Sequence, residues 1–149
     1  MRLPRSLVRL AATSVHRVRR LLWFLAGGKG PGVHAVALTP EGHVVLVRLT
    51  YVAGWRLPGG GVGRGEDEEA AILRELREEI GLAAHGAVRP VGRGFPSYFL
   101  VEDIEYSPRQ SLEVEDTRAF DPAALPADVP AIDRRVIAAA LASSKPARI

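Results

Sequence analysis

Three glutamates near the middle of the chain have a spacing suited to binding a metal ion. Glu75, Glu78 and Glu79 stand at positions i, i+3 and i+4, which lie on one face of an α-helix. Carboxylates this close repel one another and lower helix stability. A hard divalent cation reverses that effect, because Mg²⁺ and Mn²⁺ prefer carboxylate and carbonyl oxygens and often bridge protein carboxylates to substrate phosphates. For the triplet alone, a solvated acidic helix face is the alternative interpretation.

A glycine-rich loop is predicted just before this helix, at residues 59–65. Glycines let the backbone approach a ligand closely, and a helix N-terminus favours a bound anion. Together with the carboxylates, this loop indicates metal-assisted chemistry on a phosphate compound.

The longer spacing around the triplet favours this function over a solvated face. Residues 60–82 match the pattern G-x5-E-x7-R-E-U-x-E-E-x-G-U, in which U is an apolar residue. At average residue usage, the fixed letters of this pattern match by chance at about one site in 10⁸. The matching residues are Gly60, Glu66, Arg74, Glu75, Leu76, Glu78, Glu79, Gly81 and Leu82.

This stretch resembles the Nudix box of the Nudix hydrolases, and every specified position agrees. Residues 57–60 resemble the family's lead-in, and residues 113–126 resemble its downstream strand and turn, so the resemblance covers about residues 31–142. It implies the Nudix fold and an Mg²⁺-dependent hydrolase, with Mn²⁺ as a substitute metal. Such an enzyme cleaves a diphosphate linkage in a nucleoside diphosphate-linked substrate by attack of metal-activated water on phosphorus.

The resemblance also implies a set of metal ligands. The carboxylates of Glu75, Glu78 and Glu79 and the backbone carbonyl of Gly59 match the positions that hold the metal in the family. Glu66 matches the outlying glutamate of the box, which is expected either to bind metal or to brace the loop.

Arg74 and Glu113 complete the expected catalytic group, together with Glu75 and Glu78. Arg74 matches the arginine that pairs with and orients the box carboxylates, since a guanidinium is always charged and holds two carboxylate oxygens in one geometry. Glu113 matches a downstream glutamate that ligates metal in some members, whereas in others a residue of that region is the general base. A carboxylate near the attacking water can accept its proton.

Three residues are candidates for substrate binding. Arg64 is expected to reach a substrate phosphate, with solvated surface as the alternative. Tyr98 lies 16 residues beyond Leu82, where dinucleoside polyphosphate hydrolases of the family tend to have a tyrosine. Trp55 and Tyr98 have rings that stack on a base, although packing in the core is the alternative for both. The substrate stays open among nucleoside triphosphates, nucleotide sugars, ADP-ribose, dinucleoside polyphosphates and capped RNA.

Rival functions share the same fold. A Nudix-fold nucleotide-binding or regulatory module without turnover is the alternative, but such modules usually lose box carboxylates and none is lost here. An isomerase of the isopentenyl diphosphate type uses a catalytic cysteine, and the chain has none. The same absence excludes a disulfide framework, thiolate zinc sites and thiol nucleophiles.

The elements around the box predict a mixed α/β (α+β) fold, with a mixed β-sheet sandwiched between helices. A helix is expected at 67–80, with Asp67 as N-cap and Gly81 at its C-terminal end. Its apolar face is predicted to be Ala70, Leu73, Leu76 and Ile80. Residues 33–38 and 44–51 are predicted to form a hairpin around the turn at 39–42. Further strands are expected at 55–57, 98–106 and 112–120, and a final helix at 131–141.

The N-terminal arm differs in charge from the rest of the 149-residue chain, whose net charge is +3. Residues 1–30 hold seven Lys/Arg and no Asp/Glu, so the remainder, with 13 basic and 17 acidic residues, has a charge of −4. We therefore expect three parts, at 1–30, 31–142 and a flexible tail at 143–149. The arm predicts a basic amphipathic helix that packs on its own domain or in a homodimer, lies on an anionic membrane surface through residues 1–26, or serves as an organellar presequence. The longest apolar run, 136–142, is too short to cross a bilayer. We expect a cytoplasmic location. Specific binding of nucleic acid is not expected.

Overall fold

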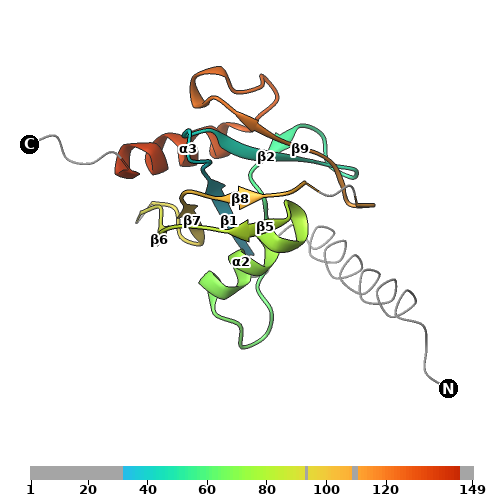
Figure 1. Cartoon of the computed structure of the whole chain (residues 1–149), viewed down its shortest axis with the longest axis vertical. Coiled ribbons are helices and arrows are strands. Elements are labelled where there is room, and N and C mark those ends of the chain that lie inside the picture. Colours follow the sequence, from blue (N-terminus) through green and yellow to red (C-terminus); the bar gives the residue numbers. More distant parts are fainter. Residues whose placement is uncertain (1–31, 93, 109–110, 145–149) are drawn as a thin grey trace, which may run out of the picture.

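The strands of the chain divide into three small sheets in the computed structural model, which describes residues 32–92, 94–108 and 111–144 (Figure 1). The largest sheet has the order β4-β1-β7-β6 and consists of β4 (Gly59–Gly61), β1 (Gly32–Ala37), β7 (Tyr98–Val101) and β6 (Val88–Pro90). Because β1 runs parallel to β7 and antiparallel to β4, this sheet is mixed. The predicted arm helix, with its membrane or subunit contacts, lies outside the described residues. Of the tail predicted at 143–149, residues 143–144 continue the final helix, and the rest lies outside the described residues.

Two smaller antiparallel sheets flank this one. The first has the order β3-β2-β9, from β3 (Trp55–Arg56), β2 (Val44–Leu49) and β9 (Val114–Phe120), and the second pairs β5 (Leu82–Ala84) with β8 (Glu105–Tyr106). Two α-helices, α2 (Glu68–Glu79) and α3 (Ala131–Ser144), and the short 3₁₀ helix η1 (Pro122–Ala124) complete the described elements.

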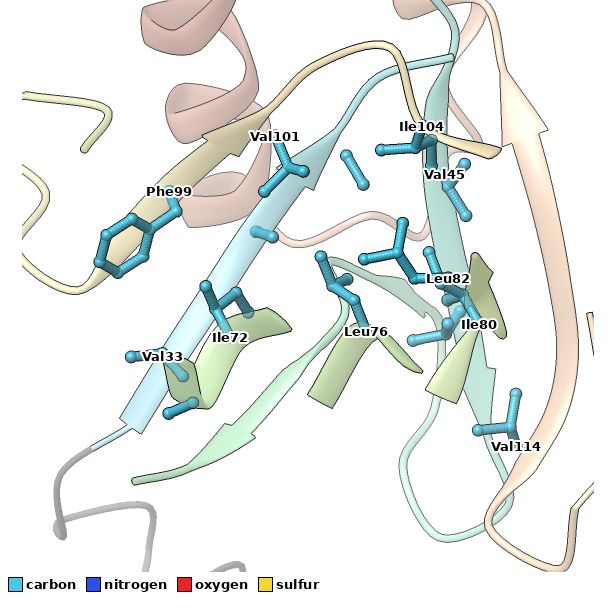
Figure 2. Packing of buried hydrophobic residues seen from close by; sticks show 14 residues of the cluster. Val33, Val45, Ile72, Leu76, Ile80, Leu82, Phe99, Val101, Ile104 and Val114 are labelled. Carbon is cyan, nitrogen blue, oxygen red and sulfur yellow. The ribbon is translucent and has the colours of Figure 1, made fainter. Parts of the chain in front are cut away.

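Strand β1 separates two hydrophobic cores, because successive side chains of a strand point to opposite faces. Val33, Ala35 and Ala37 belong to a cluster that includes Ile72 and Leu76 of α2 (Figure 2). The other face of β1 contributes Val36 and Leu38 to a second cluster, whose members from α3 are Val136, Ile137 and Ala140. The mixed α+β fold with helices on both sides of β1 is therefore confirmed.

The predicted hairpin between residues 33–38 and 44–51 is wrong, although its turn forms. The amide of Gly42 donates to the carbonyl of Thr39 at 2.8 Å, and a single antiparallel bridge joins Leu38 to Val44. Beyond that bridge the strands diverge, since β1 is paired on its two edges by β4 and β7 and β2 by β3 and β9. The chain therefore turns from one sheet into another at this point.

Three further expectations need correction. The glycine-rich segment is not wholly a loop, because Gly59–Gly61 forms β4. The strand expected at 98–106 is divided into β7 and β8 at Asp103, whose φ of 50° interrupts extended backbone. The buried face of α2 is also rotated from the predicted one: Ala70 is exposed, whereas Ala71 and Ile72 are fully buried.

Among the described residues, no helix has the length and hydropathy needed to span a membrane.

Candidate active site

Helix α2 is held at both ends, so its glutamates have defined directions. Asp67 has extended backbone angles, and its carboxylate accepts a hydrogen bond from the amide of Ala70 at 3.2 Å, as an N-cap does. At the other end Gly81 adopts a φ of +71°, and a Cβ there would lie 2.0 Å from the carbonyl oxygen of Ser107. The predicted helix and both of its end signals are therefore confirmed.

The glutamate triplet divides into two buried side chains and one exposed side chain. Glu75 and Glu79 are 2% and 3% exposed, whereas Glu78 lies on the exposed side of the helix. The carboxylate of Glu79 accepts a hydrogen bond from the amide of Gly59 at 3.1 Å. A Cβ on Gly60 would lie 2.5 Å from the carboxylate carbon of Glu75. Both buried carboxylates thus face the glycine backbone of β4, and the Glu75 carboxylate leaves no room for a side chain at Gly60.

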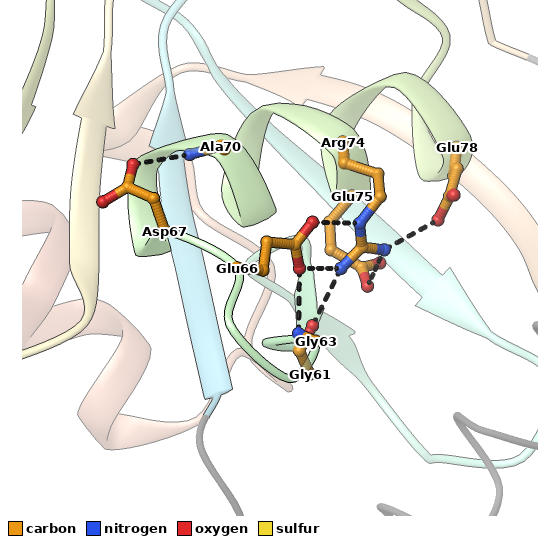
Figure 3. Close-up of polar contacts among 8 residues, drawn as sticks. All are labelled: Gly61, Gly63, Glu66, Asp67, Ala70, Arg74, Glu75 and Glu78. Atoms are coloured by element: carbon orange, nitrogen blue, oxygen red, sulfur yellow. Dashed lines mark hydrogen bonds and ion pairs between the residues drawn. The ribbon is translucent and has the colours of Figure 1, made fainter.

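Arg74 brings together three of the box carboxylates, those of Glu66, Glu75 and Glu78 (Figure 3). Its guanidinium donates to both oxygens of Glu66, at 2.9 and 2.8 Å, and to Glu75 at 3.0 Å and Glu78 at 3.4 Å. A further bond, to the carbonyl of Gly61 at 3.0 Å, ties it to β4. These bonds, of which those to Glu66 have the largest effect, raise the pKa of Arg74 above its ordinary value. The guanidinium offsets the repulsion among carboxylates, and its fork geometry fixes their orientation.

Glu66 has a bracing role in addition to its contact with Arg74. Its carboxylate accepts a hydrogen bond from the amide of Gly63 at 2.8 Å, so the loop folds back on its own glutamate. Together with Arg74, this bond connects the loop, β4 and α2 through a single side chain. Of the two roles expected for Glu66, bracing of the loop is the one that the geometry displays directly.

The atoms of this site that could bind a metal ion fit a hard divalent cation. All of them are carboxylate or carbonyl oxygens, from Glu66, Glu75, Glu78, Glu79 and the backbone of β4, and no sulfur or imidazole ligand is among them. A carboxylate offers about four lone-pair positions, so a bond to Arg74 or to an amide does not exhaust its capacity. Within the described ranges, no three acidic or imidazole groups already converge on one point as a metal cluster; the guanidinium of Arg74 holds the carboxylates instead.

The expected catalytic residue Glu113 lies directly before β9, which belongs to a different sheet from β4. Its side chain is 8% exposed. Its backbone carbonyl accepts a hydrogen bond from the amide of Thr50 at 3.0 Å, and its amide donates to the hydroxyl of Ser111 at 3.3 Å. The backbone of Glu113 is therefore held between the end of β2 and the segment that leads into β9.

The three substrate-binding candidates have different surroundings. Arg64 is exposed on the turn before α2. Tyr98 is half-buried and stacks on His34, with ring centroids 5.3 Å apart and an interplanar angle of 25°. Burial raises the pKa of Tyr98, and the negative charge of Asp133 adds to that shift. Trp55, in contrast, is 6% exposed and lies in the second core cluster, where the Arg48 guanidinium covers its ring at 4.8 Å. A ring in that position packs in the core rather than offering a face to a base.

Sequence reasoning missed two residues that lie beside the site. His34 is paired with Gly59 in the ladder of β1 and β4, and with Tyr98 in the ladder of β1 and β7. Asp133 of α3 is 8% exposed, and its carboxylate accepts a hydrogen bond from the amide of Leu57 at 3.1 Å. Neither residue belongs to a local motif. Only strand register and helix packing bring them close to the box.

Comparison with known proteins agrees with this geometry. A family model for the NUDIX domain matches residues 28–140. The RNA pyrophosphohydrolase of Hahella chejuensis is 36% identical over 76 residues, which cover 50% of this chain and 47% of that protein. The chain thus spans about half the length of the curated relatives it matches.

Solved structures share the fold at lower identity. The MutT NUDIX hydrolase from Burkholderia pseudomallei is 23% identical, with a TM-score of 0.54 over 74% of this chain and 98% of that chain. An ADP-ribose pyrophosphatase from Streptococcus suis is 20% identical, with a TM-score of 0.60 over 78% of this chain and 92% of that chain. The family model covers most of the chain and includes the whole box at 60–82, so the chain belongs to the NUDIX domain family.

Proposed function

We propose that this protein is an Mg²⁺-dependent pyrophosphohydrolase that cleaves a diphosphate linkage in a nucleoside diphosphate-linked substrate. The observation that carries the proposal is the pair of buried carboxylates, Glu75 and Glu79, held against the glycine backbone of β4. Burial of two carboxylates is costly unless charge or hydrogen bonds compensate for it. A divalent cation bound by the two carboxylates would compensate for their burial and would bind the phosphate groups of a substrate.

Each residue of the site has a role in this proposal. Glu75, Glu78, Glu79 and the carbonyl of Gly59 hold the metal, which when bound screens phosphate charge and acidifies the attacking water. Arg74 keeps the carboxylates oriented through its bonds to Glu66, Glu75 and Glu78. Glu113 accepts the proton of the attacking water or adds an oxygen ligand. Mn²⁺ is expected to replace Mg²⁺, since both prefer oxygen ligands.

The substrate is proposed to lie across β4 with its base near Tyr98. His34 is paired with Gly59 on one side and Tyr98 on the other, so Tyr98 lies two strands from the proposed metal ligand, and its ring packs against the second core cluster on the side of α3. The exposed guanidinium of Arg64 is available for a phosphate. The curated relatives are named as RNA pyrophosphohydrolases, which makes RNA that carries a pyrophosphate linkage the first substrate to test.

The test is phosphate release, with a coupled phosphatase, across a panel of substrates. The panel contains 5′-triphosphorylated and capped RNA, nucleoside triphosphates, nucleotide sugars, ADP-ribose and dinucleoside polyphosphates, each with Mg²⁺, Mn²⁺ or a chelator. Turnover of at least one substrate by wild type, lost with the chelator and in Glu79→Gln, is expected. Binding of nucleotides without turnover under any condition would instead identify a binding or regulatory module.

A further inference from the structure

The chain passes from one sheet to another immediately before the box. β3 belongs to the three-stranded sheet and β4 to the four-stranded sheet, and Leu57 and Pro58 connect them. Leu57 is 3% exposed. Backbone groups at such a crossing lie outside both strand ladders, and buried ones need hydrogen-bond partners elsewhere.

Each residue of this crossing is tied to a different element. The carbonyl of Pro58 accepts a hydrogen bond from the amide of Ala35 in β1 at 3.0 Å. The amide of Gly59 donates to Glu79 of α2 at 3.1 Å. The amide of Leu57 donates to the carboxylate of Asp133, 76 positions away in the first turn of α3, at 3.1 Å.

Burial of the Asp133 carboxylate costs desolvation free energy that packing of α3 alone does not require. The residue is 8% exposed, and burial raises its pKa above the usual 3.8, while the Leu57 bond and the charge of Arg56 act in the opposite direction. The helix N-terminus also favours a negative charge in the first turn. The Asp133 side chain is therefore a buried hydrogen-bond acceptor that points at one amide of the crossing.

We infer that Asp133 is a positioning residue, which through the amide of Leu57 sets the place of the Gly59 backbone and of the Glu79 carboxylate bonded to it. This inference rests on the proposed function, since it concerns the placement of proposed metal ligands. Proline restricts the backbone between Leu57 and Gly59, because its ring fixes φ. Displacement of Leu57 is therefore passed on to Gly59 rather than absorbed by rotation at Pro58.

A purely structural role predicts a different result from a positioning role. In a structural role, the Leu57 bond only helps α3 to pack, so any comparable loss of packing in α3 has the same effect on the site. In a positioning role, loss of the acceptor changes the metal site more than loss of buried apolar surface on the same helix. Ile137 is the matched control, because it is 2% exposed in the cluster that packs α3 on β1.

The experiment measures Mn²⁺ binding by calorimetry in the full-length protein without substrate, together with amide NMR spectra and the thermal midpoint. We expect Asp133→Ala to shift the amide resonances of Leu57 and Gly59 and to weaken Mn²⁺ binding by about tenfold or more, as removal of groups that orient metal ligands does. Asp133→Asn retains an acceptor oxygen and is expected to keep most of the affinity. Ile137→Ala is expected to lower the thermal midpoint with Mn²⁺ affinity within about twofold of wild type, since it removes packing but no bond to the crossing.

Equal Mn²⁺ affinity in wild type and a folded Asp133→Ala variant would overturn the inference, and so would equal weakening by Ile137→Ala. If Asp133→Ala does not fold, Asp133→Glu replaces it, because the longer side chain keeps the charge but moves the oxygens; unchanged affinity in that variant also overturns the inference. Failure of wild type to bind Mn²⁺ more tightly than Glu79→Gln would refute the proposed metal site itself, and the positioning role with it. The two failures are thus distinguishable.

Discussion

Substitution of Gly60 by alanine is the sharpest probe of the box, because the three atoms nearest to the added methyl group all belong to the Glu75 carboxylate. A Cβ built at this position lies 2.5 Å from the carboxylate carbon of Glu75 and 2.6 and 2.7 Å from its two oxygens. Ordinary contact begins at 3.4 Å, so the carboxylate has to retreat by 3.4 minus 2.5, or about 0.9 Å. Glu75 is 2% exposed and bonded to Arg74 at 3.0 Å, so this retreat displaces a proposed metal ligand.

Turnover is expected to fall steeply, whereas the protein is expected to stay folded. A displacement of about 1 Å at a catalytic group lowers the rate by about 100-fold, or about 2.7 kcal/mol of transition-state stabilisation. Overpacking of this kind lowers the free energy of unfolding by about 1–3 kcal/mol, which leaves an ordinary domain folded. Turnover on the best substrate of the panel measures the first quantity, and guanidinium unfolding measures the second.

Gly42→Ala is the matched control for this glycine substitution. Gly42 has a φ of +84° in the turn between β1 and β2, and a Cβ there would meet nothing within 4 Å. Strain from the left-handed backbone is expected to lower its free energy of unfolding by about 1–2 kcal/mol, with turnover unchanged. A folded Gly60→Ala protein with wild-type turnover would show that the Glu75 carboxylate has no part in the chemistry. Gly59→Ala is unsuitable here, since its Cβ would lie 2.2 Å from the backbone oxygen of Val33.

Four other changes test separate parts of the account. Arg74→Lys loses the two-pronged contact with Glu66; we expect the free energy of unfolding to fall by about 2 kcal/mol in urea titrations and turnover to fall at least about tenfold. Glu79→Gln keeps an oxygen for hydrogen bonding but removes the charge, so metal-dependent hydrolysis should vanish while circular dichroism and the thermal midpoint stay near wild type; equal turnover would contradict this. A truncate without residues 1–26 should retain turnover, because the whole box at 60–82 and the hydrogen bonds described around it lie beyond residue 30; a folded but inactive truncate would show otherwise. Finally, burial raises the pKa of Asp133, so the folded protein binds the carboxyl proton more tightly than the unfolded chain does. Wild-type stability is therefore lost as pH rises from the ordinary pKa of 3.8 through the raised pKa. In denaturant titrations, the free energy of unfolding of Asp133→Asn relative to wild type should grow across that pH window and then level off.

Local signals were sufficient for the central helix and its ends. Asp67 and Gly81 mark the ends of α2 because a carboxylate N-cap and a left-handed glycine act on the residues next to them. The buried face of that helix was mispredicted for an equally physical reason. Apolar spacing assumes that buried positions are apolar, yet Glu75 and Glu79 are buried here because backbone of β4 and the Arg74 side chain satisfy them.

Strand partners were beyond the reach of local patterns. The turn at 39–42 forms as predicted, but whether its two flanking strands pair depends on which other strands compete for their edges. β4 and β7 take both edges of β1, and these segments are distant in sequence. Trp55 likewise has the composition of a base-stacking residue, and only its burial under Arg48 shows that it packs in the core.

The amino-acid sequence by itself determined the family, the box and the residues able to bind a hard cation, because their chemistry and their spacing along one helix are local properties. Only the tertiary structure decided that Glu75 and Glu79 turn inward while Glu78 faces solvent, and that Asp133 reaches Leu57 from the last helix. These outcomes depend on contacts between segments that are far apart along the chain. Such contacts form only when burial of two separate cores offsets the entropy of bringing the segments together.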